Sequence, residues 1–485
     1  MAVILFFDDW AIQHSHGLER RWFRAEPWPG TGIFHDPALK RSFHELSIIR
    51  DEPKGSWRMW SYGLTHEGRS GKFLYTSNDG LNWSPADCGS SRKGFPNNLV
   101  FTGNTGVGGA CVVKDEIDPD AQQRYKMVYV DTLPGQPDKQ NYGQIAISAD
   151  GIQWHPLPGS AWANHHVDTF HCTRFNPFTQ RWQWTSRMIS GDRRIALYQT
   201  SDFHNFHKPD IIIHPDPDDP PCVEFYGMPH FFYGDHAVGF LWRMHSSFDE
   251  VSTSHRMRGK VDNELVYSVN GLSWNRTNRE CLTPDYGFGP DCPRCVYPQE
   301  MVLDDDGWLR IYSSIHFGEH ADNGRCKPDE PISSMTISRL RRDGFCALET
   351  SSDTAFLTLR PLVSRGGQIT LNAVTARFGS IRAELCSVPD NTPIPGFEMD
   401  NSLPVEGDGH FLPLRWKERD SIDAFRDQPF RLHLRLDRAR LYAVRTSSEY
   451  LYESHIHLNQ AGNFLPDANP EFFSPNRSNA YPRTS

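Results

Sequence analysis

A short phrase recurs along the chain and constrains the fold more than any other feature. Three copies are nearly identical, at residues 77–83 (SNDGLNW), 148–154 (SADGIQW) and 268–274 (SVNGLSW). Two eroded copies begin at Ser201 and Ser338. The five starts lie 71, 53, 67 and 70 residues apart, a period that suits one four-stranded sheet with its loops. We therefore predict an all-β fold that opens with a five-bladed β-propeller, in which the first strand of every blade lines a central pit.

The segments between the turns support this prediction. In the first repeat, short alternating runs at 46–50, 57–62 and 72–76 precede the Asn-Asp-Gly turn. No window of 12 residues carries a convincing helical period, so we expect little helix.

The recurring turn phrase is absent after Thr354, and the pattern of strand-like segments changes. Alternating segments then recur at residues 355–359, 368–372, 380–385, 411–415 and 430–436. This pattern is typical of an antiparallel β-sandwich. We predict a catalytic propeller at 1–350, a β-sandwich at 351–446, and a C-terminal tail at 447–485 that wraps a surface or is disordered.

Composition excludes several classes of partner. The chain has 485 residues, 38% of them hydrophobic and 23% charged, as in ordinary globular proteins. A net charge of −10 without basic runs argues against a nucleic acid or an anionic membrane as partner. No stretch approaches the roughly 18 apolar residues of a membrane span. The apolar N-terminal run lacks a basic flank and is interpreted as a strand, not a signal peptide. Ten scattered cysteines suit reduced thiols and a cytoplasmic location.

The residues at or just before the first strands are the candidates for chemistry. Four of the five blades offer a carboxylate there: blade one with Asp36 and Glu45, blade three with Asp168, blade four with Glu224 and blade five with Glu300. Of these acids we predict Asp36, Glu45, Asp168 and Glu224 to be catalytic. Like charges crowded in a pit raise one another's pKa, so one acid can stay protonated while another stays ionised. Cleavage of a glycosidic bond needs that division. Each acid could instead be a solvated loop carboxylate or a salt-bridge partner.

A second set of residues is predicted to bind substrate: His35, His166, His171, Arg187, Tyr226, Arg243, Glu300 and His316. The histidines around Asp168 could ligate a metal or shuttle protons, but no motif organises them, so hydrogen bonding to the acid is favoured. Cys292 and Cys295 could hold zinc with Cys281 and Cys326, yet the chain lacks a second C-x-x-C. We therefore expect no metal and no cofactor. Arg187 and Arg243 could grip a substrate carboxylate or form structural ion pairs.

At this level the chain resembles a known group. The S-x-D-G-x-x-W turns, the five blades and the trailing sandwich are similar to the propeller glycosidases of glycoside hydrolase families 32 and 43. Residues 168–187 and 381–442 resemble a bacterial group described as family 32-like. The family's Asp-Pro nucleophile motif is echoed only by His35-Asp36-Pro37, Asp168 lies in the third blade where the family stabiliser lies in the second, and Glu224 lacks the Cys that follows the family's acid. The resemblance implies an exo-acting glycosidase of unassigned sugar.

The leading functional hypothesis is a glycoside hydrolase that removes a terminal furanose, such as arabinose or fructose, from an oligosaccharide. One alternative is a propeller polysaccharide lyase, in which His166 abstracts a proton from a uronate and an arginine neutralises its carboxylate. Another is a carbohydrate-binding propeller without catalysis, which would lack two carboxylates within about 5 to 9.5 Å. The partner is in every case a saccharide, and an exposed sandwich leaves room for a homo-oligomer.

Overall fold

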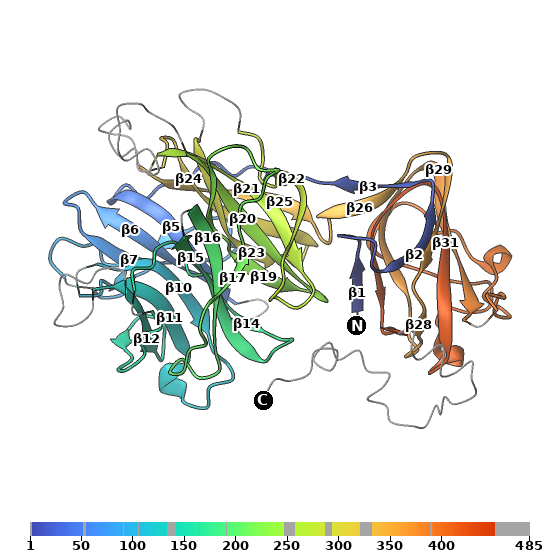
Figure 1. Cartoon of the computed structure of the whole chain (residues 1–485), viewed down its shortest axis with the longest axis horizontal. Helices are drawn as coiled ribbons and strands as arrows, with labels where there is room; N and C mark the ends of the chain where they lie inside the picture. The colour runs from blue at the N-terminus through green and yellow to red at the C-terminus, as the bar shows by residue number, and fades with distance from the viewer. Residues whose placement is uncertain are drawn as a thin grey trace. The chain divides into compact units, whose positions relative to one another are not determined.

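The computed structural model describes residues 2–451 except 52–54, 91, 105, 133–141, 164, 191, 247–257, 287–292, 321–331 and 389. The chain divides into two compact units (Figure 1). The blade unit comprises residues 24–304 and 309–339. The sheet unit comprises residues 1–23, 305–308 and 340–485.

Strands form nearly all of the regular structure. In the described ranges the other elements are three 3₁₀ helices of three residues each: η1 (Ala121–Gln123), η3 (Met399–Asn401) and η4 (Asp423–Phe425). The prediction of an all-β chain with little helix is confirmed. Within the part of the chain that the structure describes, no helix has the length and apolar character needed to span a membrane.

The strands of the blade unit fall into five groups, which we call blades one to five in chain order. Blade one holds β5 (Leu39–Arg50), β6 (Trp57–Thr65), β7 (Ser70–Ser77), β8 (Ser84–Pro85) and the short β9 (Leu99–Phe101). Blade two holds β10 (Gly108–Lys114), β11 (Tyr125–Asp131), β12 (Tyr142–Ser148) and β13 (His155–Pro156). Blade three holds β14 (Thr173–Asn176), β15 (Arg181–Ser190), β16 (Asp192–Thr200) and β17 (Asp210–Ile213).

The last two blades are joined in one hydrogen-bonded sheet. Blade four holds β18 (Val223–Gly227), β19 (His230–Tyr233), β20 (His236–Ser246), β21 (Gly259–Ser268) and β22 (Asn275–Cys281). Blade five holds β23 (Cys295–Leu303), β24 (Trp308–His316), β25 (Ser334–Arg341) and β4 (Glu26–Pro27). Val261 of β21 pairs with Cys295 of β23 in parallel register, which links the two blades.

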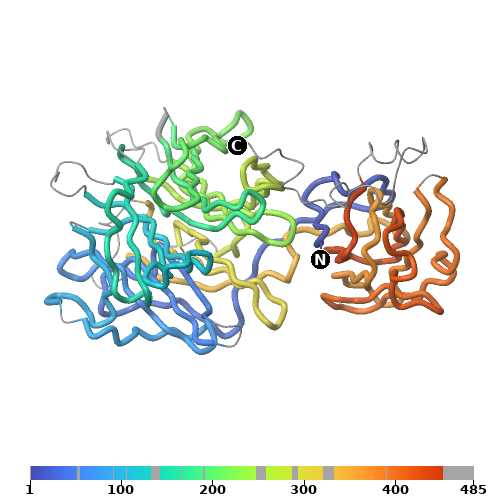
Figure 2. Tube along the Cα trace, turned by 90° about the horizontal axis from the view of Figure 1, so that it is seen from below, coloured from blue at the N-terminus to red at the C-terminus, as the bar shows by residue number. Residues whose placement is uncertain are grey.

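The blades follow one another in a closed order. β5 contacts β10, β10 contacts β14, β14 contacts β19, β20 contacts β23, and β23 contacts β5 again. Figure 2 shows the same succession, because the trace passes from blue through cyan and green to yellow around this unit. At the start of the unit, β4 pairs with β25 and completes blade five. The count of five blades is our interpretation of this grouping, and it places the first strands around a common centre.

The recurring phrase forms the same turn at each complete copy. In the first copy, the Ser77 hydroxyl accepts a hydrogen bond from the Gly80 amide (2.9 Å). The Asp79 carboxylate accepts from the amides of Leu81 and Asn82, both at 2.8 Å. Gly80 has φ +69°, a left-handed conformation that glycine adopts without strain. Asp150 and Asn270 make the equivalent bonds in the next two copies.

The turns also lock neighbouring blades together. A glycine carbonyl of each turn accepts a side-chain hydrogen bond from the preceding blade: Tyr312 Oη to Gly80 O (2.8 Å), Trp60 Nε1 to Gly151 O (2.7 Å) and Gln183 Nε2 to Gly271 O (3.2 Å). The first of these bonds joins blade five to blade one. The recurring turn therefore stabilises the contact between neighbouring blades as well as its own hairpin.

We expect the turn carboxylate to contribute measurably to stability. Asp79→Ala removes the acceptor of two backbone amides and should lower the free energy of unfolding by about 1 kcal/mol. Burial raises the pKa of Asp79, but the Asn82 and Leu81 amides outweigh it and hold the pKa at about 2. The contribution should therefore be complete above about pH 4 and be lost as pH falls toward 2. Urea titration of both proteins at several pH values measures this difference, with Asn78→Ala as the control within the same turn.

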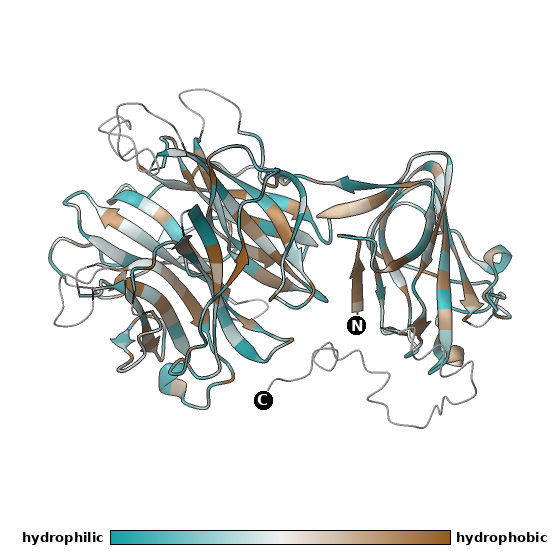
Figure 3. Ribbon diagram, viewed as in Figure 1, coloured by the Kyte–Doolittle hydropathy of each residue, from teal (hydrophilic) through white to brown (hydrophobic). Residues whose placement is uncertain are grey.

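The strands of the sheet unit join into one ten-stranded antiparallel sheet. They are β1 (Ala2–Leu5), β2 (Ile12–His16), β3 (Leu18–Trp22), β26 (Cys346–Thr350), β27 (Thr354–Leu359), β28 (Leu362–Val363), β29 (Thr370–Ser387), β30 (Asp408–Pro413), β31 (Pro429–Thr446) and β32 (Glu449–Tyr450). Along β31, buried residues alternate with more exposed ones over much of the strand. Figure 3, which colours each residue by hydropathy, shows both hydrophobic and hydrophilic residues on this strand. Leu432, Leu434 and Leu436 are buried, so one face of this strand belongs to the core.

Two predicted boundaries need correction. Residues 1–23 were predicted in the propeller at 1–350, but β1, β2 and β3 pair with β31, β27 and β26 of the sheet unit. The strands of the predicted sandwich at 351–446 therefore share their sheet with the N-terminus. Of the predicted tail at 447–485, β32 pairs with β28, and residues 452–485 lie outside the described part.

Candidate active site

Glu45 lies on an irregular stretch of β5. The pairing of β5 with β6 shifts register on both sides of His44, and Phe43 and Glu45 have φ values of +54° and +53°. Such conformations are unfavourable for residues with a Cβ and are typical of functional sites. The Glu45 carboxylate accepts hydrogen bonds from the amides of Gly109 (2.8 Å) and Ala110 (3.0 Å) at the start of β10. Blade one thus presents its acid to blade two.

A buried lysine supports this acid. Lys72 of β7 has no exposed surface, and its ammonium donates to the carbonyl oxygens of Glu45 (2.5 Å) and Ala110 (2.6 Å). Burial lowers the pKa of Lys72 to about 8. Burial raises the pKa of Glu45, and this effect exceeds the opposing ones of Lys72 and the two amides. The negative charge of Asp168 raises the pKa of Glu45 further.

Asp168 precedes β14, the first strand of blade three. Its Oδ2 accepts from Arg187 of β15 at 2.5 Å, and its Oδ1 accepts from the amide of Thr169 at 2.9 Å. Thr169 has φ +116°, a strained conformation for a β-branched residue. Burial raises the pKa of Asp168, but Arg187 and the Thr169 amide outweigh it and lower the pKa. The Asp168 side chain keeps 42% of its surface exposed, so its carboxylate is accessible to a ligand.

Arg187 and Tyr226 form the next layer around Asp168. The Arg187 guanidinium lies over the Tyr226 ring at 4.4 Å, and the carbonyl of Tyr226 accepts from the Thr169 hydroxyl at 2.7 Å. Burial raises the pKa of Tyr226, and Asp168 adds to this rise while Arg187 opposes it. Two residues before Tyr226 on β18, Glu224 forms a buried ion pair with Arg193 of β16.

Histidine and tyrosine rings from blades one and five also belong to the candidate site around Asp168. The His44 ring lies 5.3 Å from that of His316 and 5.8 Å from that of Tyr297. The Tyr297 hydroxyl pairs with Nδ1 of His320 at 3.0 Å, and the His320 ring lies 4.4 Å from the Tyr226 ring. Burial lowers the pKa of all three histidines, to about 3 for His320. The imidazoles are therefore neutral at physiological pH.

These residues share one electrostatic environment. The charge of Asp168 raises the pKa of Glu45 on β5, of His44 beside it, of Tyr226 on β18 and of His320 after β24. The charge of this one accessible carboxylate is thus felt by side chains of blades one, four and five, in addition to its direct contact with Arg187 of blade three. An ionised acid and an acid with a raised pKa in one place permit proton donation and charge stabilisation at the same substrate.

Other predicted residues lie elsewhere. Asp36 is buried against blade one, where its Oδ2 accepts from the Tyr75 hydroxyl of β7 at 2.7 Å and it lines a cavity of about 210 Å³ with residues of that blade. His35 contacts Ser42 on the same side. His35 and Asp36 were predicted to lie at the first strand of blade one. In the structure, the segment before β5 brings Asp36 against β7, the third strand of the blade. Asp36 therefore has a structural environment in place of the predicted catalytic one.

Arg243 was predicted to bind substrate but belongs to an ion-pair network inside blade four. Its Nε donates to Asp262 (2.8 Å) and its NH1 to the fully buried Glu264 (3.1 Å), both on the neighbouring strand β21. Arg276 of β22 also pairs with Glu264. Arg243 therefore forms structural ion pairs, which was the alternative to a role in substrate binding.

Glu300 lies one layer deeper along the first strands. It pairs with Arg174 at 2.5 Å and accepts from the Ile48 amide at 3.3 Å. Burial raises its pKa to about 7. Cys111, to which the Thr173 amide donates at 3.3 Å, belongs to the same layer. These contacts bind blades one, two, three and five to one another beneath the group around Asp168.

The two predicted histidines next to Asp168 differ in environment. His166 is exposed, whereas His171 is fully buried with its ring 4.8 Å from Trp162. In its protonated form, each would lower the pKa of Asp168. Burial lowers the pKa of His171 to about 3, so it packs as a neutral ring.

Sequence reasoning missed Lys72, Arg193, Tyr297 and His320. Tyr297 is on the first strand of blade five, one position before the Pro298-Gln299-Glu300 segment that we singled out, so the alternation along that strand could have found it. Lys72 is on β7 and Arg193 is on β16, the third strands of blades one and three, and their side chains reach the centre because they are long. No pattern in the sequence signals that reach.

Comparisons with known proteins return solved structures. Neither a family model nor a curated protein matches the chain. A thermostable family-43 glycoside hydrolase is 14% identical, covers 68% of this chain and 97% of its own, and has a TM-score of 0.42. The GH32 β-fructofuranosidase BmSUC1 of Bombyx mori is 11% identical over 86% of this chain and 94% of its own, with a TM-score of 0.43. The catalytic domain of a GH62 α-L-arabinofuranosidase of Coprinopsis cinerea is 11% identical over 66% and 97%, with a TM-score of 0.41.

Proposed function

We propose that the protein is a glycoside hydrolase whose catalytic centre lies around Asp168. The observation that carries the proposal is the pair formed by Asp168 and Glu45. Burial raises the pKa of Asp168, but Arg187 and the Thr169 amide lower it further than burial raises it. Burial raises the pKa of Glu45, and the charge of Asp168 raises it further. One acid is thereby prepared to remain ionised and the other to hold a proton, which is the division of labour in glycoside hydrolysis.

The two acids take different roles in this proposal. Ionised Asp168, with an accessible carboxylate, acts as the nucleophile or as the base that activates water. Glu45 supplies the proton to the leaving oxygen, since its raised pKa favours the neutral form. The ion pair of Glu224 with Arg193 leaves Glu224 a supporting position beside Tyr226.

The rings around Asp168 suit a saccharide. His44 and Tyr226 are partly exposed and offer aromatic faces and polar edges, and sugars present apolar C–H faces and hydroxyl groups to such surfaces. The buried rings of Tyr297 and His316 pack behind them. Because burial keeps His44 and His316 neutral, they can accept or donate a hydrogen bond without adding charge. The finer part of the proposal, exo action on a terminal furanose of an oligosaccharide in the cytoplasm, is supported by the sequence resemblance and by the composition.

A second candidate is a lyase acting on a uronate. The observation that favours it is the contact chain Tyr297–His320–Tyr226, with Arg187 over the Tyr226 ring. A neutral histidine beside a tyrosine can abstract a proton, and an arginine can neutralise a carboxylate. In this candidate function the base that abstracts the proton is the buried His320, in place of the exposed His166 considered from the sequence.

A screen with purified protein separates these functions. Aryl furanosides and pyranosides release a coloured phenol if the protein is a glycosidase, and uronate polymers give an unsaturated product if it is a lyase. Binding of oligosaccharides without turnover of either substrate class would contradict both enzymatic proposals and favour a carbohydrate-binding module.

The pH dependence of hydrolysis should be bell-shaped. Activity requires Asp168 ionised, so kcat/KM falls as pH drops through its lowered pKa, and it requires Glu45 protonated, so kcat/KM falls as pH rises through its raised pKa. Glu45→Gln should remove the alkaline limb and leave the acid limb in place. A profile of the variant that keeps both limbs would assign the proton donor to another residue, with Glu224→Gln as the next variant to measure.

A further inference from the structure

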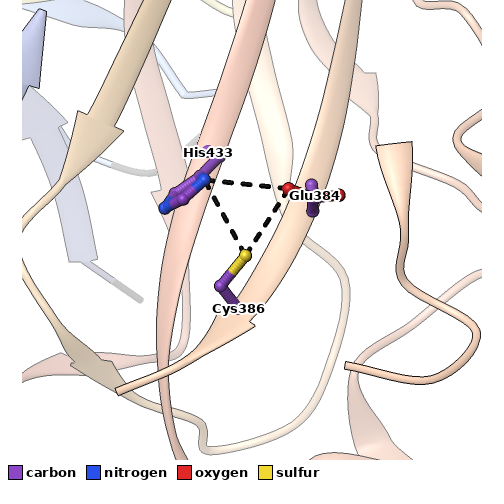
Figure 4. A group of neighbouring side chains, drawn as sticks. All are labelled: Glu384, Cys386 and His433. Carbon is purple, nitrogen blue, oxygen red and sulfur yellow. Dashed lines mark hydrogen bonds and ion pairs between the residues drawn. The ribbon is translucent and has the colours of Figure 1, made fainter. Parts of the chain in front are cut away.

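A glutamate, a cysteine and a histidine meet on one face of the sheet unit. Glu384 and Cys386 are two residues apart on β29, so their side chains point to the same side of the sheet. His433 of β31 is paired directly with Glu384 in the register of the two strands. Figure 4 shows the three side chains directed toward one another. The two longest strands of the unit therefore bring together three groups that commonly ligate metals.

The spacing of the three ligand atoms matches one face of a tetrahedron. Cys386 Sγ lies 3.5 Å from Glu384 Oε1 and 3.8 Å from His433 Nδ1, and the last two atoms are 3.8 Å apart. Zinc bonds of about 2.3 Å to sulfur and about 2.0 to 2.2 Å to nitrogen and oxygen place tetrahedral ligands about 3.4 to 3.6 Å from one another. A Zn²⁺ ion therefore needs side-chain shifts of only a few tenths of an ångström.

The surroundings leave the three atoms available. The Met399 amide donates to Oε2 of Glu384 at 3.1 Å, which directs Oε1 toward the thiol and the imidazole. Arg431 is opposite Cys386 in register, but its guanidinium donates to Gln13 Oε1 (2.9 Å) and to the Ser387 carbonyl (3.3 Å).

Burial is graded across the cluster. Cys386 is 1% exposed, whereas the side chains of Glu384 and His433 keep 19% and 21% of their surface. A water molecule can therefore reach the fourth ligand position.

We propose that Glu384, Cys386 and His433 bind one Zn²⁺ ion, with a water molecule as the fourth ligand. The ion replaces the proton on the Cys386 sulfur, and that proton passes to solvent as the Zn–S bond forms. Because the ligands come from both β29 and β31, the ion cross-links the central strands of the sheet. Three protein ligands and an exchangeable water form an open coordination sphere.

The experiment measures metal content of the full-length protein. Protein treated with a chelator is dialysed against Zn²⁺, freed of excess ion, and analysed for zinc by mass spectrometry. We expect about one zinc per chain, and Cys386→Ser and His433→Ala should each reduce it at least tenfold. Cys346→Ser and His410→Ala, which change the same residue types elsewhere in the sheet unit, should retain it. Wild type without bound zinc, or an unchanged content in Cys386→Ser and His433→Ala, would overturn the proposal.

Cobalt provides a second readout that a folding defect cannot imitate. Co²⁺ bound to wild type should give a thiolate charge-transfer band together with the strong visible absorption of tetrahedral cobalt. The charge-transfer band should be absent from Cys386→Ser while the circular dichroism of the β-sheet is unchanged. Glu384→Gln should keep the band and bind Co²⁺ at least tenfold more weakly. A charge-transfer band in Cys386→Ser would place the metal on another cysteine and contradict this site.

Discussion

Asp168→Asn should lower kcat by about 10²- to 10⁴-fold on any glycoside that the wild type hydrolyses. The amide cannot attack the sugar or accept a proton from water, and losses of this size are usual when a group that transfers protons is removed. The shape of the side chain is preserved, so KM should change little. Steady-state kinetics on the best aryl glycoside from the screen measures both constants.

Blade four offers a matched control for this variant. Asp262 has a similar exposed fraction to Asp168 (38% against 42%) and is likewise paired with an arginine, Arg243, at 2.8 Å. Asp262→Asn therefore removes a comparable ion pair outside the proposed centre. It should leave kcat within about twofold of the wild type. An equal loss in both variants would mean that the arginine pairs act on stability, and an unchanged kcat in Asp168→Asn would remove Asp168 from catalysis.

The repeat was predictable because its chemistry is local. A turn of four to seven residues is held by bonds between Ser77, Asp79 and their nearest neighbours, so its sequence alone indicates its shape. The same reasoning found the strands that precede each turn. The N-terminal strands were misplaced for the opposite reason. Ala2 pairs with Thr446, and nothing in either segment identifies a partner more than four hundred residues away.

The candidate site was predicted in part for similar reasons. Asp168 and Tyr226 were named because the first strands of a closed ring must converge, and Arg187 because it was expected near the channel at the end of a second strand. In the structure Arg187 pairs with Asp168 and lies over the Tyr226 ring. Asp36 was named by the same rule, but its carboxylate turns to the Tyr75 hydroxyl. The rule locates a backbone near the centre, whereas the rotamer of a side chain depends on neighbours that only the folded structure supplies.

The three proposed zinc ligands of the sheet unit show the limit of motif reasoning. Glu384 and Cys386 are close in sequence, but His433 is almost fifty residues away and enters through the pairing of β29 with β31. The search for zinc ligands centred on Cys292 and Cys295, the one C-x-x-C of the chain. Cys292 and Cys326 lie outside the described residues, and the register of two long strands, not a sequence spacing, brings the candidate ligands together.

Lys72→Met should reduce the free energy of unfolding by about 3 to 5 kcal/mol. Methionine fills a similar volume, but the buried carbonyl oxygens of Glu45 and Ala110 lose their charged hydrogen-bond donor, and the cation that lowers the pKa of Glu45 is removed. Denaturant titration followed by tryptophan fluorescence measures the loss. Lys114→Met is the control, because Lys114 forms a surface ion pair with Glu116 whose loss should cost no more than about 1 kcal/mol.

The pH dependence of this loss distinguishes the buried charge from a packing defect. Burial lowers the pKa of Lys72 to about 8 from its ordinary value of 10.5, so between these pH values the unfolded chain holds more protons than the folded one. Deprotonation of Lys72 should therefore increase the free energy of unfolding of the wild type as pH rises from about 8 to 10.5. Lys72→Met should show no such increase. A difference in the free energy of unfolding that stays constant between about pH 8 and 10.5 would show that the pKa of Lys72 is not shifted in the folded protein.

Lys72→Met also removes a cation that lowers the pKa of Glu45, so the alkaline limb of hydrolysis should move to higher pH. The stability of the blade unit is thereby linked to the proton donor of the proposed reaction.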